Sequence, residues 1–321
     1  MPDKKITIGI RNSNLSKAQT NQLIEALIEA TPSLNENDIQ TEFIQTTGDK
    51  NPTHRLDQIG GKGLFIKEIE EHIIKGTVDL GVHSLKDLPA TADLGELELI
   101  CWMRRQSPQD SLLSNSGKTF SELPAGSIIG TSSIRRRAQI LSLRPDLSIK
   151  LLRGNVDTRV NKLHNREYDA ILLSLAGLER LGLEDLVTET LPLDLFLPAA
   201  CQGTVAVQAK QNSPLKNVLM NINDETTQLE STAERLVLKT INANCNSPVS
   251  VYAKINSDKI TIDCVLYAHN GEKLFMQSVT DDKVNFKQLS VTLGENIISA
   301  VGQEHINALD NLEDDFDYTP S

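Results

Sequence analysis

Short apolar stretches alternate with amphipathic stretches in two parts of the chain, and this alternation restricts the possible folds more than any other feature. Residues 5–10 alternate like a β-strand, and Ser13 or Asn14 can cap a helix whose apolar residues fall on one face. A second strand is predicted over 41–46 and a helix over 64–75, and residues 78–82 are short and apolar enough for a buried strand of a parallel sheet. This order of strand, helix and strand predicts an α/β lobe.

The same alternation returns in the middle of the chain. Residues 127–130 are typical of a strand, and the following Thr-Ser-Ser can cap a helix that runs to about residue 143. A strand over 148–152, a helix over 156–164 and a strand over 169–173 complete the pattern. The sequence therefore predicts a second α/β lobe.

The C-terminal third has a different pattern. A long helix is predicted from about residue 226, followed by three strands near 249–255, 260–268 and 273–279 and a helix over 286–309. This order indicates a small α+β domain.

We therefore predict two doubly wound, periplasmic-binding-protein-like α/β lobes around a cleft, together with a small α+β C-terminal domain. Residues 205–207 are a candidate strand that returns to the first lobe. The predicted domains are 5–103 with 204–222, then 109–197, then 226–310, and residues 311–321 form an acidic tail, of which we expect residues 313–317 to be frayed.

The charge of the chain is acidic on average but basic in one region. Acidic residues outnumber basic ones by 43 to 32, for a net charge of -11, which argues against nucleic-acid or anionic-membrane partners. Ten of the 13 arginines nevertheless lie between Arg104 and Arg180. We expect a cytoplasmic monomer without a metal site, because there is no signal-peptide core, no membrane-length apolar run and no ligand spacing among the histidines.

Cations, hydroxyls and predicted helix N-termini follow the predicted strands of both lobes. Ligands of open α/β sheets bind at the carboxyl ends of the strands, where helix N-termini favour anions and arginine forks match carboxylates. The alternative is a set of separate, solvated arginines, which would not concentrate at strand ends. The pattern therefore favours a polyanion site at these strand ends, where Arg11 and Ser13, then Lys86, then Thr131, Ser132, Ser133, Arg135, Arg136 and Arg137, and finally Arg153 and Arg159 occur.

Two further residues have open interpretations. Asp87, which stands among these cations, can be a capping or ion-paired aspartate, or a carboxylate that stabilises a cation developing on the ligand. Cys245 lies in a polar loop and can be an attachment point or a nucleophile, although a single loop cysteine is a weak signal. Cys264 lies in an apolar strand and is expected to belong to the core.

Five motifs occur together in a recognisable order. They are Gly60-Gly61-Lys62-Gly63-Leu64-Phe65, Val82-His83-Ser84-Leu85-Lys86-Asp87-Leu88-Pro89, Gly130-Thr131-Ser132-Ser133-Ile134-Arg135-Arg136, Leu152-Arg153-Gly154-Asn155-Val156-Asp157-Thr158-Arg159, and Cys245 followed by Pro248. With these motifs the chain, from about residue 5 to 310, closely resembles the hydroxymethylbilane synthase (porphobilinogen deaminase) family.

The resemblance implies a reaction and a cofactor. The family joins four porphobilinogen molecules head to tail into hydroxymethylbilane and releases ammonia, in tetrapyrrole (heme) biosynthesis. Its dipyrromethane cofactor is built from substrate and attached through a thioether, which here would involve Cys245. Asp87, with Lys86 beside it, matches the family's catalytic aspartate, which stabilises positive charge as ammonia leaves.

The resemblance also divides the remaining site residues into two groups. Cofactor carboxylates would be held by Lys86, Thr131, Ser133, Arg135 and Arg136, with Ser13 nearby. Arg11, Arg153 and Arg159 would bind the incoming substrate or the growing chain, and Gly60 to Gly63 would belong to a mobile loop over the site.

Some positions differ from the family pattern. Thr47 and Gln58 replace cations, Asn14 replaces a proline, and Asn244 replaces a glycine before Cys245, where it could hinder a tight turn. Two alternatives therefore stay open: a non-catalytic two-lobed protein that binds a carboxylated solute, and an impaired family member that binds pyrroles without polymerising them.

Overall fold

The computed structural model describes residues 5–46, 66–244, 246–310 and 316–320. The chain forms two compact units, Met1–Gln106 with Thr204–Gln228 (unit 1) and Ser107–Gly203 with Leu229–Ser321 (unit 2). The sequences predicted as the second and third domains both belong to unit 2. The finer division into three domains stays a prediction.

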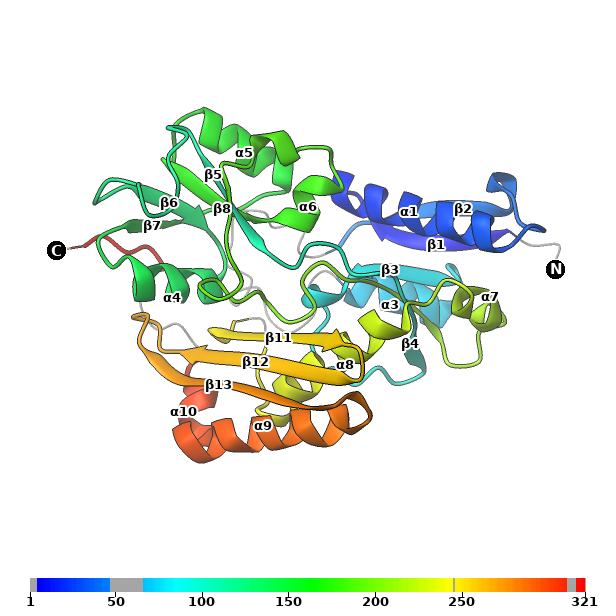
Figure 1. The fold of residues 1–321 in the computed structure, drawn as a ribbon. Helices are drawn as coiled ribbons and strands as arrows, with labels where there is room; N and C mark the ends of the chain where they lie inside the picture. The colour runs from blue at the N-terminus through cyan, green and yellow to red at the C-terminus, as the bar shows by residue number, and fades with distance from the viewer. Residues whose placement is uncertain (1–4, 47–65, 245, 311–315, 321) are drawn as a thin grey trace. The chain divides into compact units, whose positions relative to one another are not determined.

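Unit 1 contains a five-stranded sheet in the order β2-β1-β3-β10-β4 (Figure 1). β1 pairs in parallel with β2 and β3, whereas β10 is antiparallel to β3 and β4. The predicted return of residues 205–207 to the first lobe is thereby confirmed. The strands are β1 (Ile6–Arg11), β2 (Ile39–Ile44), β3 (Leu80–Ser84), β4 (Leu97–Trp102) and β10 (Val205–Lys210), and the helices are α1 (Asn14–Ala30), α3 (Lys67–Lys75) and α7 (Lys216–Met220), with short 3-10 helices η1 (Glu36–Asp38) and η2 (Leu85–Asp87).

The helices of unit 1 form because their apolar residues recur at helical spacing. α1 buries Leu23 and Leu27, and α3 buries Ile69 and Ile73. The helix predicted from residue 64 is seen from Lys67 onward, and residues 64 and 65 lie outside the described chain. The predicted first lobe is thus confirmed, with one antiparallel pair of strands added to its parallel core.

Unit 2 contains a second five-stranded sheet in the order β7-β6-β8-β5-β9. β6 pairs in parallel with β7 and β8, and β5 is antiparallel to β8 and β9. The two antiparallel strands were not predicted, since both are short and carry polar residues. The elements are β5 (Asp110–Ser114), β6 (Ile128–Thr131), α4 (Ile134–Leu143), β7 (Ser148–Leu151), α5 (Val156–His164), β8 (Ala170–Ser174), α6 (Leu175–Glu179), η3 (Glu184–Leu186) and β9 (Glu189–Thr190).

The α+β part of unit 2 is a three-stranded antiparallel sheet with helices (Figure 1). The helix predicted over 286–309 is divided at Gly302. The φ of this glycine is 87°, a value that does not occur inside an α-helix. α9 buries Leu293 and Ile297. The elements are α8 (Glu225–Thr240), β11 (Val249–Asn256), β12 (Lys259–Tyr267), β13 (Lys273–Asp282), η4 (Lys283–Asn285), α9 (Phe286–Val301) and α10 (Gln303–Ala308).

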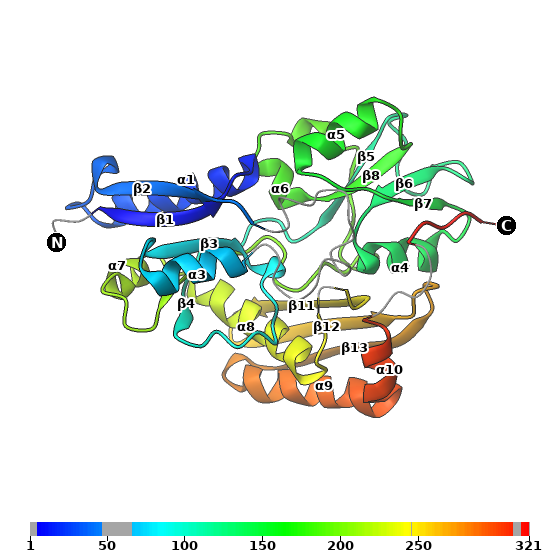
Figure 2. The same cartoon turned by 180° about the vertical axis from the view of Figure 1, so that it is seen from behind.

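The C-terminal residues 316–320 lie along β7, as Figure 2 shows. Tyr318 and Ile149 exchange two backbone hydrogen bonds of 2.8 Å, and the Leu151 N–H donates to Asp317 Oδ1 at 2.8 Å. Phe316 is buried in the core of the adjoining lobe. The expectation of fraying is therefore wrong for Phe316 and Asp317, because an aromatic anchor and the open edge of β7 offset the local acidity. Residues 311–315 lie outside the described chain.

Replacing Phe316 by alanine is expected to lower the free energy of unfolding by about 3 kcal/mol, because it empties a buried aromatic site. Thermal or urea unfolding measures the change. Val284→Ala, at an 80% exposed apolar residue of the same unit, serves as the control and should have little effect. Equal midpoints for the two variants would show that the C-terminal segment contributes no packing energy.

Candidate functional site

The carboxyl ends of β1 and β3 place four predicted site residues at one edge of the unit 1 sheet. The two strands are parallel neighbours, so Arg11 at the end of β1 and the turn after β3 share that edge. The Ser13 hydroxyl accepts a 3.2 Å hydrogen bond from the Ser16 N–H and thereby caps α1. Lys86 and Asp87 form the end of η2.

Asp87 is exposed at this edge. Leu85 and Leu88 on either side are buried, and the Leu85 N–H donates to the Thr204 carbonyl at 3.0 Å, which fixes the turn. Within the described chain the Asp87 carboxylate forms no hydrogen bond or ion pair. The interpretation of Asp87 as a capping or ion-paired residue therefore finds no support in these residues.

The second group of predicted residues follows β6 and β7, which are parallel neighbours in unit 2. The Ser133 hydroxyl caps α4 by accepting from the Arg136 N–H at 3.3 Å, and the Ser133 N–H donates to Thr131 Oγ1 at 3.2 Å. Arg153 follows β7, and Arg159 Nε donates to the Gly154 carbonyl one turn earlier at 2.7 Å. Both lobes thus carry their cations and hydroxyls at the carboxyl ends of parallel strands.

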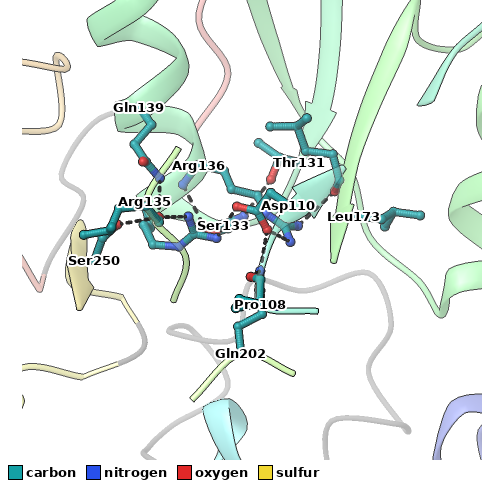
Figure 3. Close-up of polar contacts among 12 residues, drawn as sticks. Pro108, Asp110, Thr131, Ser133, Arg135, Arg136, Gln139, Leu173, Gln202 and Ser250 are labelled. Atoms are coloured by element: carbon teal, nitrogen blue, oxygen red, sulfur yellow. Dashed lines mark hydrogen bonds and ion pairs between the residues drawn. The ribbon is translucent and has the colours of Figure 1, made fainter. Parts of the chain in front are cut away.

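Arg135 and Arg136 are buried and share one carboxylate, that of Asp110 at the start of β5 (Figure 3). Arg135 Nη2 lies 2.7 Å from Asp110 Oδ2, and Arg136 Nη2 lies 2.7 Å from Asp110 Oδ1. Gln202 Nε2 donates to Asp110 Oδ1 at 2.8 Å. Each arginine also donates through Nη1 to a backbone carbonyl at 2.9 Å, that of Leu197 for Arg135 and that of Leu172 for Arg136.

This cluster carries a net charge of +1. Burial alone would raise the pKa of Asp110, but the charges of Arg135 and Arg136 and the hydrogen bonds from Arg136 and Gln202 hold it well below its usual range. Burial lowers the pKa of Arg135, and the charge of Asp110 opposes that change. Asp110 is therefore ionised and neutralises one of the two arginines.

The arginine pair has unused donors. Each guanidinium has five N–H donors, of which two are engaged with the described residues. Arg135 Nε and Arg136 Nε are buried without a hydrogen-bond partner there. Buried donors without acceptors are costly, so the excess charge and the unused donors fit an anionic group with carboxylates.

Other arginines of the region have structural roles that the sequence pattern did not separate from binding. Arg137 Nε donates to the Phe316 carbonyl at 2.9 Å, Arg144 pairs with Asp146 at 2.7 Å, and Arg180 Nη2 donates to the Gly203 carbonyl at 2.8 Å. Conversely, two residues of the arginine cluster, Asp110 and Gln202, were missed by the sequence analysis. Neither was predicted, because their partners are distant in sequence and no local motif marks them.

The loop that carries Cys245 is anchored on both sides of that residue, although Cys245 itself lies outside the described chain. Asn244 Nδ2 donates to Asp310 Oδ2 at 2.6 Å, and the Ser247 hydroxyl donates to Asp310 Oδ1. Asn244 does not adopt a positive φ, so its backbone does not need the freedom of glycine. Thr47, Gln58 and Gly60 to Gly63 also lie outside the described residues.

The described cysteines are poor nucleophiles. Cys101, Cys201 and Cys264 are buried, and burial raises the pKa of Cys101 and of Cys264 to about 12. The prediction that Cys264 belongs to the core is confirmed. No cluster of three metal-binding side chains occurs in the described residues, and none of their helices has the length and apolarity needed to cross a membrane.

Comparison with known proteins gives consistent matches over most of the chain. Residues 6–217 match the family described as "Porphobilinogen deaminase, dipyromethane cofactor binding domain", and residues 228–299 match "Porphobilinogen deaminase, C-terminal domain". The porphobilinogen deaminase of an Exiguobacterium species is 40% identical over 94% of this chain and 97% of its own length. That of Geobacter sulfurreducens is 36% identical over 94% and 93%. The chain therefore belongs to the porphobilinogen deaminase family.

Proposed function

We propose that this chain is an active hydroxymethylbilane synthase that joins four porphobilinogen molecules head to tail and releases ammonia, in heme biosynthesis. The observation that carries the proposal is the buried Arg135–Arg136 pair, whose charge exceeds that of Asp110 by one and whose donors are only partly used. Such a pair suits a ligand with several carboxylates. The dipyrromethane cofactor, attached through Cys245, is such a ligand and supplies the end from which the chain grows.

Asp87 is proposed as the catalytic residue, with Lys86 beside it. Its carboxylate is exposed at the end of β3 and forms no ion pair with the described residues, which leaves it available to a ligand. Loss of ammonia from porphobilinogen leaves positive charge on the pyrrole. A carboxylate held close to the ring nitrogen stabilises that charge more strongly as it develops, and this lowers the barrier.

The remaining residues are proposed to hold carboxylates. Thr131, Ser133, Arg135 and Arg136, together with Lys86 and Ser13, bind those of the cofactor. Arg11, Arg153 and Arg159 follow the parallel strands β1 and β7 and bind those of the incoming substrate or growing chain. Each porphobilinogen carries two carboxylates, so an elongating chain needs several cations.

The surroundings of the enzyme follow from its charge and its substrate. We propose a cytoplasmic monomer that acts on small-molecule porphobilinogen and has neither nucleic-acid nor membrane partners. The net charge of -11 supports this proposal, since polyanionic surfaces would repel most of the protein.

Intact-mass spectrometry tests the proposal. Protein made in a host that produces porphobilinogen should exceed its sequence mass by two pyrrole units, and Cys245→Ser should remove the excess. Cys101→Ser, at a buried cysteine with a raised pKa, is the matched control and should keep it. An unmodified wild-type mass, together with binding of porphobilinogen without ammonia release, would instead support the non-catalytic binding protein.

A further inference from the structure

We infer that Asp110 is the positioning residue of the arginine pair: it holds Arg135 and Arg136 in the orientation that receives a ligand carboxylate. The inference rests on the proposed function and deepens it. Within the described residues the Asp110 carboxylate bonds Arg135, Arg136 and Gln202, so its effect on a ligand passes through the two guanidinium groups.

The first step of the argument is geometric. Asp110 presents one oxygen to each arginine, at 2.7 Å in both cases, and therefore fixes the two forks relative to each other. The Leu197 and Leu172 carbonyls hold the other Nη atom of each fork at 2.9 Å. Each guanidinium is thus fixed at two points, and its plane cannot turn without breaking a buried hydrogen bond.

The second step concerns Asp110 itself. Asp110 is the first residue of β5, and its side chain is completely buried. Gln202 Nε2 donates to Asp110 Oδ1 at 2.8 Å and to the Pro108 carbonyl at 2.7 Å. A neutral amide therefore ties the carboxylate to the backbone two residues earlier. The carboxylate is held from the protein side, independently of any ligand.

The third step concerns charge. Two buried guanidinium groups without an anion repel each other and lose hydration, which favours displacement of one of them towards solvent. Asp110 removes this repulsion and still leaves a charge of +1 for a ligand carboxylate. If Asp110 instead occupied the place of the ligand carboxylate, it would have to move away from the two arginines when the ligand binds.

Cofactor loading measured on three variants separates positioning from competition. Full-length protein made in a host without porphobilinogen is incubated with porphobilinogen, and the gain of two pyrrole units is followed by intact-mass spectrometry. Asp110→Asn is expected to load at least about tenfold more slowly than the wild type, because it removes the shared anion and turns an amide donor towards the arginines. Asp110→Glu, which keeps the charge, should recover part of the rate.

A destabilised control removes the contribution of weaker folding. Leu112→Ala empties a fully buried apolar site two residues along β5, and at an equal folded fraction it should load like the wild type. If Asp110→Asn does not fold, Gln202→Met decides, since it releases one hydrogen bond to Asp110 without changing charge and should also slow loading.

The outcomes are distinct. Loading of Asp110→Asn at the rate of Leu112→Ala overturns the positioning role, and loading faster than the wild type shows that Asp110 competes with the ligand. Wild-type-like loading of Gln202→Met, where it has to decide, also overturns the inference. If the wild type itself gains no mass, the proposed function fails, and the inference fails with it.

Discussion

Asp87→Ala is expected to lower the rate of ammonia release from porphobilinogen by on the order of a thousandfold, while the protein keeps its fold. The fold should survive because the side chain is exposed and forms no hydrogen bond or ion pair with the described residues. Leu85 and Leu88, which are buried, hold the turn without it. The measurement is ammonia released per enzyme in single-turnover and steady-state assays, with circular dichroism on the same samples.

Two matched variants identify the cause of the loss. Asp87→Asn keeps the shape and one acceptor oxygen but removes the charge, so it should lose nearly as much activity as Asp87→Ala. Asp93→Ala, at an exposed aspartate of the same unit whose carboxylate accepts a hydrogen bond from the Gly95 N–H, should retain activity. Turnover of Asp87→Ala close to the wild-type rate would exclude Asp87 from the chemistry.

The elements that the sequence predicted well are those whose pattern is local. The helix predicted over 156–164 is α5, Val156–His164, and the strand predicted near 249–255 is β11, Val249–Asn256. In both, apolar spacing and flanking turn residues suffice to set the bounds. The break at Gly302 was missed because a helical pattern continues on both sides of it.

The site residues likewise divide into those that a local sequence pattern predicts and those that depend on distant partners. Residues at the carboxyl ends of strands, such as Arg11 in β1 and Thr131 in β6, could be predicted because strand ends are readable in the sequence. Asp110 could not, since its role depends on Arg135 and Arg136, 25 and 26 residues away, and on antiparallel pairing of β5 that no local pattern indicates. An arginine also looks the same in sequence whether it binds a ligand or, like Arg137, a backbone carbonyl.

Asp110→Ala is expected to lower the free energy of unfolding at neutral pH by about 4 kcal/mol, because it leaves two buried guanidinium groups without their shared anion. Urea unfolding of the full chain measures the loss. Asp146→Ala is the control: it breaks an Arg–Asp pair of the same unit at the same 2.7 Å, but Asp146 is 40% exposed, so its loss should cost much less than the loss of Asp110. Similar losses in both variants would show that burial does not strengthen the Asp110 cluster.

The difference between the wild type and Asp110→Ala should also depend on pH, in a direction fixed by the pKa of Asp110. That pKa is held well below the ordinary value of about 3.9, so the stabilisation is fully present above this value and is lost as the pH falls below it. His83 affects the stability of the protein in a different pH range. Burial lowers its pKa to about 4, so the folded state loses stability relative to the unfolded state as the pH falls from about 6.5 to 4. Both proteins should therefore weaken alike between about pH 6.5 and 4, whereas below pH 4 the wild type should weaken more steeply and the two stabilities should converge. Parallel stability curves down to the acid limit would contradict an ionised Asp110 between the two arginines.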